Sequence, residues 1–563
     1  MTLESSHVTG ATTPPLYEDT IGAALKQAAV QWPEREALVS VHQNIRWSFA
    51  ELDRRAGELA AGLLCLGIEP GDRVGIWAPN CAEWALTQFA TAKAGMILVN
   101  INPAYRTAEL EYTLNKVDVK ALVVAERFRS SDYPAMLAEL APEIARAKPG
   151  ALIAKRLPQL KSLIIIGDVP RAGYFRFRDV VGMGQPKHHI ALAAIEHKVV
   201  AREPINIQFT SGTTGQPKGA TLSHRNILNN AFLVGRSIGL EEGDRVCIPV
   251  PLYHCFGMVM GNLACVVHGA TMVYPADGFE PMAVLSAVER EKCTALYGVP
   301  TMFIAMLDLP EFARFDLTSL RTGIMAGAPC PIEVMRRVIE QMHMSGVTIA
   351  YGMTETSPVS FQSSTDDPIE RRVSTVGRVQ PHLEVKIVDE HGATTPVGVP
   401  GELCTRGYSV MLGYWDDEEK TNEAVDRDGW MHTGDLATID ADGYGNIVGR
   451  IKDMVIRGGE NVYPREIEEF LFRHPKVADV AVVGIPDAKY GEELAAWIML
   501  KHGEHAHEDE IKAFARNNIA HYKVPRYVRF VDAFPMTVTG KIQKFLIREA
   551  MIEELGLSEQ KTA

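Results

Sequence analysis

Several features are absent from this chain, and each absence excludes a class of protein. The eight cysteines are scattered from Cys65 to Cys404 and include no C-x-x-C pair, which argues against a disulfide framework or a zinc site. No uninterrupted apolar run reaches the roughly 18 residues of a membrane span, so no transmembrane segment is predicted. The histidine-containing tract Lys501–His507 is more typical of a solvated loop than of a metal site.

Basic residues and targeting signals are also scarce. The 57 lysines and arginines are outnumbered by 70 acidic residues, giving a formal net charge of -13, which argues against non-specific binding to nucleic acid. The N-terminal residues contain Glu4, no arginine and no apolar signal core, so neither a signal peptide nor a transit peptide is predicted. We therefore expect a cytoplasmic protein.

The 563 residues exceed a single hydrophobic core and predict at least two domains. In the N-terminal part, helical and strand-like patterns alternate, which is typical of a mainly parallel sheet covered by helices. The predicted elements are a helix capped by a Ser48–Glu51 capping box and ending at Gly67, a strand at Arg73–Trp77, a helix at Cys81–Lys93 and a strand at Met96–Val99.

The same winding continues further along and then changes character. A helix capped by Ser223 and a strand at Val246–Val250 are followed, from about Val373, by short glycine-rich β segments. A compact α+β pattern fills the rest of the chain. We therefore predict an α/β fold with a large N-terminal domain of mainly parallel sheets and a β subdomain (1–451), and a small mobile α+β domain (452–563) hinged near Lys452.

The run Thr210–Gly219, TSGTTGQPKG, is typical of a phosphate cradle. Glycines let backbone N–H groups approach a ligand, hydroxyls add donors, and Lys218 adds a charge. Pro217 breaks the Walker A pattern, so a chemistry unlike that of kinases is expected. A mobile surface loop could have the same composition. The candidate phosphate ligands are Thr210, Ser211, Gly212, Thr213, Thr214, Gly215 and Lys218.

Further candidate residues are weak singly but share a theme of nucleotide chemistry. His254 follows an apolar strand, where open α/β sheets bind ligands. Tyr351 could stack on a purine, and Glu355, four residues later, could hold Mg²⁺. The other candidates are the turn Gly327, Ala328 and Pro329, the pair Asp435 and Arg450 for a ribose, the loop Gly458 and Gly459, and Lys541.

In their order and spacing these motifs resemble the adenylate-forming superfamily of acyl-CoA synthetases, luciferases and peptide-synthetase adenylation domains. The resemblance runs from about Asp19 to Leu546 and rests on TSGTTGQPKG, PLYHCFG, GAP, YGMTE, GELCTRG, WMHTGD, GRIKDMVIRGGENVYPREIE and TGKIQK. The chain looks most similar to medium-chain fatty acyl-CoA synthetases. The resemblance implies a reaction in two steps. In the first, a carboxylic acid reacts with ATP in the presence of Mg²⁺ to form an acyl-adenylate. In the second, coenzyme A displaces AMP from this intermediate.

The resemblance also implies residue roles. Thr210 to Lys218 would hold the β- and γ-phosphates, Thr354 the α-phosphate and Glu355 the metal ion. Lys541 would bridge carboxylate and phosphate oxygens in the first step. The remaining implied roles are a gate at His254, an adenine border at Ala328 and Tyr351, a ribose grip at Asp435 and Arg450, a hinge at Lys452, and a pantetheine tunnel at Gly458 and Gly459.

The acid itself is less well defined. The segment around His254 lacks the aspartate that pairs an amino-acid amine, which argues against a peptide-synthetase domain. An aryl-CoA ligase, a fatty acyl-AMP ligase and a non-catalytic nucleotide-binding regulator would each be compatible with many of the same motifs. Candidate pocket segments are Tyr253–Met258, Gly298–Met302 and Gly323–Gly327. Because Met302 and Met325 would shorten the pocket, we expect short-to-medium aliphatic acids.

The expected partners are the carboxylic acid, ATP and coenzyme A, with no nucleic acid. Homodimer formation is left open by the sequence. Lys541, on a glycine turn, is a candidate for a lysine acetyltransferase, since acetylation would remove its charge.

Overall fold

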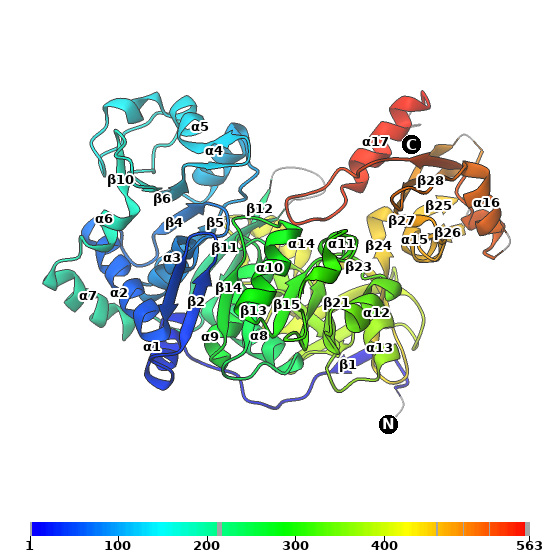
Figure 1. The fold of residues 1–563 in the computed structure, drawn as a ribbon, viewed down its shortest axis with the longest axis horizontal. Coiled ribbons are helices and arrows are strands. Elements are labelled where there is room, and N and C mark those ends of the chain that lie inside the picture. Colours follow the sequence, from blue (N-terminus) through cyan, green and yellow to red (C-terminus); the bar gives the residue numbers. More distant parts are fainter. Residues whose placement is uncertain (1–2, 211–216, 458–459, 488, 517, 558–563) are drawn as a thin grey trace.

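Two parts of unequal size make up the protein (Figure 1). The structure is a computed structural model and describes residues 3–210, 217–457, 460–487, 489–516 and 518–557. Among the described residues the large part carries three sheets of five to nine strands and one short two-stranded sheet, and the small part is a separate α+β unit that ends in the C-terminal helix. This arrangement confirms the predicted fold class. No helix among the described residues is long and apolar enough to cross a membrane.

The first sheet has eight strands and is parallel over most of its width. Its order is β10-β9-β6-β4-β5-β11-β12-β22, in which only β12 and β22 run antiparallel to their neighbours. The strands are β4 (Arg73–Trp77), β5 (Ile97–Asn100), β6 (Val119–Ala125), β9 (Ser162–Ile166), β10 (Tyr174–Arg176), β11 (Pro204–Thr210), β12 (Lys218–Ser223) and β22 (Gly413–Tyr414).

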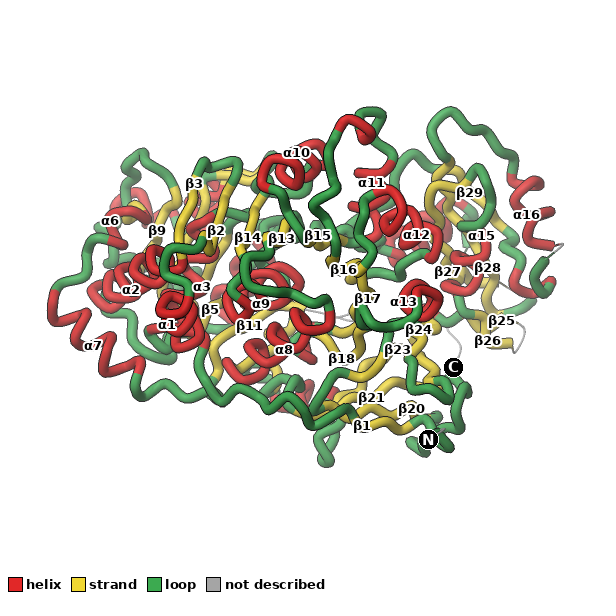
Figure 2. The backbone as a smooth tube through the Cα atoms, turned by 60° about the horizontal axis from the view of Figure 1, so that its bottom comes forward, coloured by secondary structure: helices red, strands yellow, loops and turns green. Residues whose placement is uncertain are grey.

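The second sheet has nine strands in the order β19-β18-β17-β16-β15-β13-β14-β2-β3, parallel from β17 to β2. Helices cover both faces (Figure 2): α8 and α9 lie on one side and α10, α11 and α12 on the other. The bounds are β2 (Glu36–Ser40), β3 (Ile45–Ser48), β13 (Arg245–Cys247), β14 (Thr271–Tyr274), β15 (Ala295–Gly298), β16 (Thr322–Ala326), β17 (Gly346–Gly352), β18 (Val359–Gln362), β19 (Arg378–Val379), α8 (His224–Ser237), α9 (Ala264–His268), α10 (Pro281–Glu291), α11 (Pro300–Leu307) and α12 (Ile332–Gln341).

The core of the large part is continuous between these two sheets. Side chains of α1 (Ile21–Gln31), α2 (Phe49–Cys65) and α3 (Ala82–Lys93) join those of α8 and α9 in one buried cluster. A second cluster lies under α10, α11 and α12. Consecutive residues of a strand face opposite sides. Accordingly Ile324 and Ala326 of β16 belong to the first cluster, and Met325 belongs to the second.

The predicted β subdomain is a five-stranded antiparallel sheet, β1-β20-β21-β23-β24. Its strands are β1 (His7–Thr9), β20 (Leu383–Val388), β21 (Gly401–Gly407), β23 (Met431–Ile439) and β24 (Gly445–Arg450). A bulge interrupts β23, because Glu402 and Cys404 of β21 pair with Leu436 and His432. An advance of two residues along β21 thus corresponds to four residues along β23. The extra residues displace the segment around Gly434 from the regular ladder.

The small part has its own core. Strands β25 (Val455–Arg457), β26 (Glu460–Val462), β27 (Val477–Asp487), β28 (Gly491–Leu500) and β29 (Tyr527–Phe530) form one sheet. Apolar clusters on its two sides are completed by α15 (Pro464–Leu471) and α16 (Glu508–Arg516) and by α17 (Lys544–Glu554). We call this unit, with the connecting loop that carries Lys541, the lid.

Local predictions are confirmed in part. The strand Arg73–Trp77 and the helix after Cys81 are found where they were predicted. The Ser48 hydroxyl accepts from the Glu51 amide at 3.2 Å, but the Glu51 side chain bonds Arg55 instead of closing the capping box. The strand predicted to reach Val250 ends at Cys247, because the prolines at 249 and 251 have no N–H to donate.

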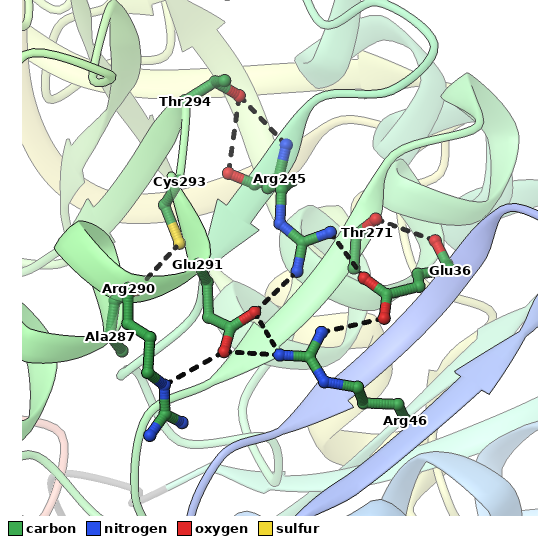
Figure 3. A network of polar contacts seen from close by, with 9 residues as sticks. All are labelled: Glu36, Arg46, Arg245, Thr271, Ala287, Arg290, Glu291, Cys293 and Thr294. Carbon is green, nitrogen blue, oxygen red and sulfur yellow. Dashed lines mark hydrogen bonds and ion pairs between the residues drawn. The ribbon is translucent and has the colours of Figure 1, made fainter.

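One polar network ties the far edge of the second sheet together (Figure 3). The carboxylate of Glu291, at the end of α10, accepts from Arg46 at 2.6 Å and from Arg245 at 2.9 Å. Arg290 adds a third contact at 3.2 Å, and Glu36 bonds both Arg46 and Arg245. Because the Glu291 side chain is 3 % exposed while the arginines reach solvent, its charge is the one that this network must keep paired.

We expect Glu291→Gln to destabilise the large part by about 2–3 kcal/mol. Breaking a buried pair costs ~3–5 kcal/mol, and the solvent contact of the arginines reduces that figure. Urea or thermal unfolding measures the change. Glu390→Gln, in the exposed Glu390–His391 pair, is the control and should stay within about 0.5 kcal/mol; an equally small effect of Glu291→Gln contradicts the prediction.

Candidate active site

The predicted site residues come from loops that follow parallel strands of the second sheet. Gly327 follows β16, Glu355 follows β17, and His254 lies in the loop beyond β13. The carboxyl ends of parallel strands meet at one edge of a sheet, where open α/β folds bind ligands. The first sheet, the β subdomain and the lid supply the remaining groups at this edge.

Glu355 lies in space beside Thr210, the first residue of the predicted phosphate loop. Its carboxylate Oε1 accepts from the Thr210 hydroxyl at 3.1 Å and from the Tyr414 hydroxyl at 2.9 Å. The ammonium of Lys218 lies 4.9 Å from the centre of the Tyr414 ring. Thr354 is buried beside Glu355 in the same 3-10 turn, Thr354–Thr356. Thr210 at one end of the loop thus contacts the acid and Lys218 at the other end contacts Tyr414, whereas Ser211, Gly212, Thr213, Thr214 and Gly215 lie outside the described residues.

Tyr414 was missed by the sequence analysis. It reaches the site from β22, which pairs with β12 only after the chain has passed through the second sheet. Burial and the neighbouring carboxylate of Glu355 raise the pKa of its phenol far above the usual range. The phenol is thus a permanent hydrogen-bond donor to Glu355. Its place in the sequence, seven residues after the GELCTRG motif, gives no local signal of this role.

A second cluster joins Tyr351, Asp435 and Arg450. The Tyr351 hydroxyl donates to Asp435 Oδ2 at 2.6 Å, and Arg450 Nε lies 3.1 Å from Asp435 Oδ1. Asp435 and Arg450 face each other directly across β23 and β24. Gly434 adopts a left-handed φ of 69° in the bulge just before Asp435. The sequence prediction that these residues act together is consistent with this geometry.

The lid brings Lys541 to the same edge. Gly540 precedes it with a left-handed φ of 78°, and its carbonyl accepts from the Thr301 hydroxyl at 3.4 Å. A Cβ at Gly540 would lie only 2.8 Å from Val299 Cγ2, so a side chain there would be strained and would force Val299 to shift. Lys541 also lies close to Gly327, whose Cβ would be 3.9 Å from the lysine Cε.

The charges around Lys541 set its ionisation. Burial lowers the pKa of its ammonium, and Arg450 lowers it further, while Asp435 and Glu355 act in the opposite direction. The lysine is therefore in electrostatic contact with both clusters. Its hairpin is closed by a bond from the Thr537 amide to the Lys541 carbonyl at 2.8 Å. The apolar neighbour Val538 packs against the main core of the large part.

His254 is held neutral. Its Nδ1 accepts from the Phe256 amide at 3.3 Å, which places the proton of the neutral ring on Nε2. Burial lowers the pKa of the imidazole to about 3, and the positive charge of Lys541 contributes to the same shift. The neighbouring Tyr253 ring meets it edge-on at 6.4 Å between centroids.

Three sets of predicted site residues remain: the turn Gly327–Pro329, Lys452, and the pair Gly458 and Gly459. The turn Gly327, Ala328 and Pro329 borders Lys541, and the Cys330 thiol donates to the carbonyls of Met325 and Ala328 at 3.4 and 3.5 Å. Lys452 lies in the 3-10 turn Ile451–Asp453 between β24 and the lid, where it is exposed and has no ion-pair partner among the described residues. Gly458 and Gly459 lie outside the described residues.

Two family models match the chain. The model described as AMP-binding enzyme matches residues 25–415, and the AMP-binding enzyme C-terminal domain matches residues 466–541. Medium-chain acyl-CoA ligase ACSF2, mitochondrial, from Danio rerio is 49% identical over 559 residues, covering 99% of this chain and 92% of that protein. The putative acyl-CoA synthetase YngI of Bacillus subtilis is 51% identical over 545 residues, covering 96% and 99%.

Solved structures show the same fold. The anthranilate CoA ligase AuaEII in complex with anthranoyl-AMP superposes with a TM-score of 0.85 at 29% identity, covering 97% of this chain and 99% of that one. ATP-bound MatB from Rhodopseudomonas palustris gives a TM-score of 0.80 at 28% identity, covering 95% and 99%. Both superpositions include the lid as well as the large part.

We expect His254 to stay neutral from about pH 8 to about pH 5. Since the folded-state pKa lies near 3 and the reference value is 6.5, the stability linked to the neutral ring is complete above pH 6.5. It is lost as the pH falls from 6.5 towards 3, because the unfolded chain then binds the extra proton. Nitrogen NMR of histidine-labelled protein, with His254→Asn for assignment, reports the tautomer; an imidazolium signal at pH 6 contradicts this.

Proposed function

Because this chain belongs to the AMP-binding enzyme family and is an AMP-forming acyl-CoA ligase, we propose that the edge between the second sheet, the β subdomain and the lid forms its active site. The observation that carries this proposal is the convergence of Glu355 from the second sheet, and of Asp435 and Arg450 from the β subdomain, on Lys541 of the lid. Its substrates are ATP, coenzyme A and a carboxylic acid, for which we propose a short-to-medium aliphatic chain.

The Tyr351 cluster is suited to a nucleoside. Asp435 is fixed by Tyr351 and Arg450, and a carboxylate held in this way can accept both hydroxyls of a ribose. The turn Gly327–Pro329 lies beside it and exposes backbone that can border a flat ring. We propose that adenosine binds there, with its phosphates directed towards Thr354 and the loop from Thr210 to Lys218.

Glu355 fits the metal role expected of it. Its Oε1 is occupied by Thr210 and Tyr414, while its Oε2 has no hydrogen-bond partner among the described residues. A free carboxylate oxygen is the ligand that Mg²⁺ prefers, together with water and phosphate oxygens. When bound, Mg²⁺ would neutralise charge on the phosphates. The protein itself orients the carboxylate through the two hydroxyl donors.

Lys541 would act in the first of two steps. A carboxylate oxygen of the acid attacks the α-phosphorus of ATP, and the bond to pyrophosphate breaks. The Lys541 ammonium, held between the two clusters, stabilises the negative charge that is shared by the attacking and phosphoryl oxygens. In the second step the coenzyme A sulfur attacks the acyl carbon, its thiol proton passes to solvent, and AMP leaves.

A lysine on a separate lid can serve one step and be withdrawn for the other. We propose that the large domain ends at residue 451 and that Lys452, in the connecting turn, is the hinge. We also propose that Gly458 and Gly459 line the route of the pantetheine. His254, neutral and able to donate from Nε2, would then separate the acyl pocket from that route.

The acyl pocket is expected on the side of the second sheet that carries His254. Phe256 stacks on Tyr297 at 5.8 Å between ring centroids, and Met302 belongs to the same buried cluster. Met325, named with Met302 from the sequence, instead faces the cluster under α10 to α12. We propose that Met302, and not Met325, limits the length of the acid. The name of the Danio rerio relative supports a medium chain.

We propose a cytoplasmic enzyme that needs no nucleic acid. Self-association into a homodimer and acetylation of Lys541 by a lysine acetyltransferase are further proposals, the second because loss of the ammonium charge would disable the first step.

We expect Lys541→Ala to reduce adenylate formation by about 10²–10³-fold, the usual loss for one charge-stabilising donor. Thioester formation from supplied acyl-adenylate should be largely retained. Pyrophosphate release and AMP release measure the two half-reactions separately. Lys501→Ala, on the lid with its ammonium bonded to the Pro475 carbonyl, is the control. An equal loss of both half-reactions in Lys541→Ala contradicts the assignment.

A kcat/KM series from C3 to C16 acids plus benzoate tests the acid. We expect the maximum among short-to-medium chains and a broad profile, since one methylene changes the free energy by only about 1–3 kcal/mol. Met302→Ala should move the maximum to longer acids, and Met325→Ala should leave it in place. A wild-type maximum at C16 or at benzoate contradicts the proposed acid, and a shift caused by Met325→Ala contradicts the proposed pocket.

A further inference from the structure

Three side chains of different chemistry meet on β21 and β23, on the β subdomain and apart from the groups assigned to ATP. Cys404 of β21 pairs directly with His432 of β23, and Glu402 lies two residues before Cys404. Residues two apart on a strand share a face. Their ligand atoms, one sulfur, one nitrogen and one oxygen, all lie within 4.8 Å of one another. Among the described residues this is the only such group of three potential metal ligands.

The distances within this group are close to those of a tetrahedral metal site. Cys404 Sγ lies 3.5 Å from His432 Nδ1, and Glu402 Oε2 lies 2.9 Å from the same nitrogen. Metal bonds of ~2.3 Å to sulfur and ~2.0–2.1 Å to nitrogen or oxygen give tetrahedral edges of roughly 3.3–3.6 Å. The sulfur–nitrogen edge already fits, and the oxygen–nitrogen edge needs a widening of only a few tenths of an ångström.

The other nitrogen of His432 faces a carboxylate, the kind of partner that a metal-bound histidine usually has. His432 Nε2 lies 3.7 Å from Asp426 Oδ2. A ligating imidazole usually donates its second N–H to a carboxylate, which fixes the orientation of the ring. Asp426 is itself held by bonds from the amides of Asp428 and Trp430 to its Oδ1, both at 2.9 Å. A small shift of the ring or of Asp426 would close this contact to a hydrogen bond, with Nδ1 still directed towards Cys404 and Glu402.

Burial distinguishes the three ligands. Cys404 is fully buried beneath Trp430 and Val388, whereas the side chains of Glu402 and His432 are 23% and 34% exposed. A metal ion can thus enter from the solvent side, and one position would remain for water. The buried thiol gives selectivity, because sulfur ligands favour zinc and its transition-metal neighbours over Mg²⁺ and Ca²⁺.

We propose that Glu402, Cys404 and His432 bind one Zn²⁺ ion, with water as the fourth ligand and Asp426 orienting His432. Binding releases the thiol proton of Cys404, and the proton on His432 Nδ1, to solvent. This site differs from the Mg²⁺ site proposed at Glu355. It also departs from the expectation, drawn from the absence of a C-x-x-C pair, that the cysteines do not bind zinc.

The ion would stabilise the turn that carries Asp435. Glu402 Oε1 accepts from the Gly434 amide at 3.1 Å, so the same carboxylate would bridge the metal and the bulge of β23. Thr433 also holds the turn against β21, because its hydroxyl donates to the Leu403 carbonyl at 2.7 Å. Zinc is therefore expected to raise the unfolding temperature of the full-length protein without entering the reaction.

Cobalt is the probe, because Co²⁺ replaces Zn²⁺ and a cobalt–thiolate bond gives a charge-transfer absorption. Metal-free full-length protein is titrated with Co²⁺ and the cobalt is then displaced with Zn²⁺. We expect one equivalent of Co²⁺, the thiolate band, and its loss on adding Zn²⁺. Cys404→Ser and His432→Gln should abolish the band, with circular dichroism showing that each variant is folded.

Two controls make the result specific. Cys65→Ser removes a partly exposed cysteine elsewhere, and a variant with His502, His505 and His507 all changed to alanine removes the other histidine-rich tract; both should keep the band. Asp426→Asn should weaken the affinity for the metal by about 10–100-fold. The proposal is overturned if the folded wild type binds no cobalt, if it binds cobalt without the thiolate band, or if the band survives Cys404→Ser. None of these outcomes bears on the Lys541 half-reactions.

Discussion

The active site depends on bringing two carboxylates and two cations to one edge of a sheet without letting them neutralise each other. Asp435 is paired with Arg450, and Glu355 is bonded by two neutral hydroxyls instead of by a cation. A carboxylate that accepts only from Thr210 and Tyr414 keeps its negative charge available for a metal ion. Lys541 lies near both acids without an ion pair to either among the described residues, so its charge remains available to a ligand.

Packing between the lid and the large part determines how closely Lys541 can approach the site. The lid meets the large part through a glycine turn, and the conformation of Gly540 and its closeness to Val299 both disfavour a side chain there. Val538 adds an apolar contact on the main core. Such a contact is small compared with the separate cores of the lid, which is the condition for a domain that can move as a unit.

How much could be predicted depended on whether the signal was local. The strand at Arg73–Trp77 and the helices capped by Ser48 and Ser223 were predicted because apolar spacing and capping residues lie within a few positions of each other. Tyr414 was not, because its contact with Glu355 is made across strands that are far apart in the sequence. Met325 was named for the acyl pocket because it is bulky and lies in the candidate segment Gly323–Gly327, and the side of β16 that it faces became clear only from the packing. Helix α17 was also missed, although its buried residues Ile547 and Met551 have helical spacing.

Strand β23 shows how a local irregularity can serve two purposes. If β23 ran regularly beside β21, Gly434 and Asp435 would be held in the ladder between the two strands. The bulge frees this segment, so that Asp435 pairs with Arg450 on one neighbour while the Gly434 amide bonds Glu402 on the other. The bulge that directs Asp435 towards the active site thus also leaves His432 facing Cys404 and Glu402. A metal ion there would restrain the bulge from the side away from ATP, where the backbone ladder itself provides no hydrogen bonds.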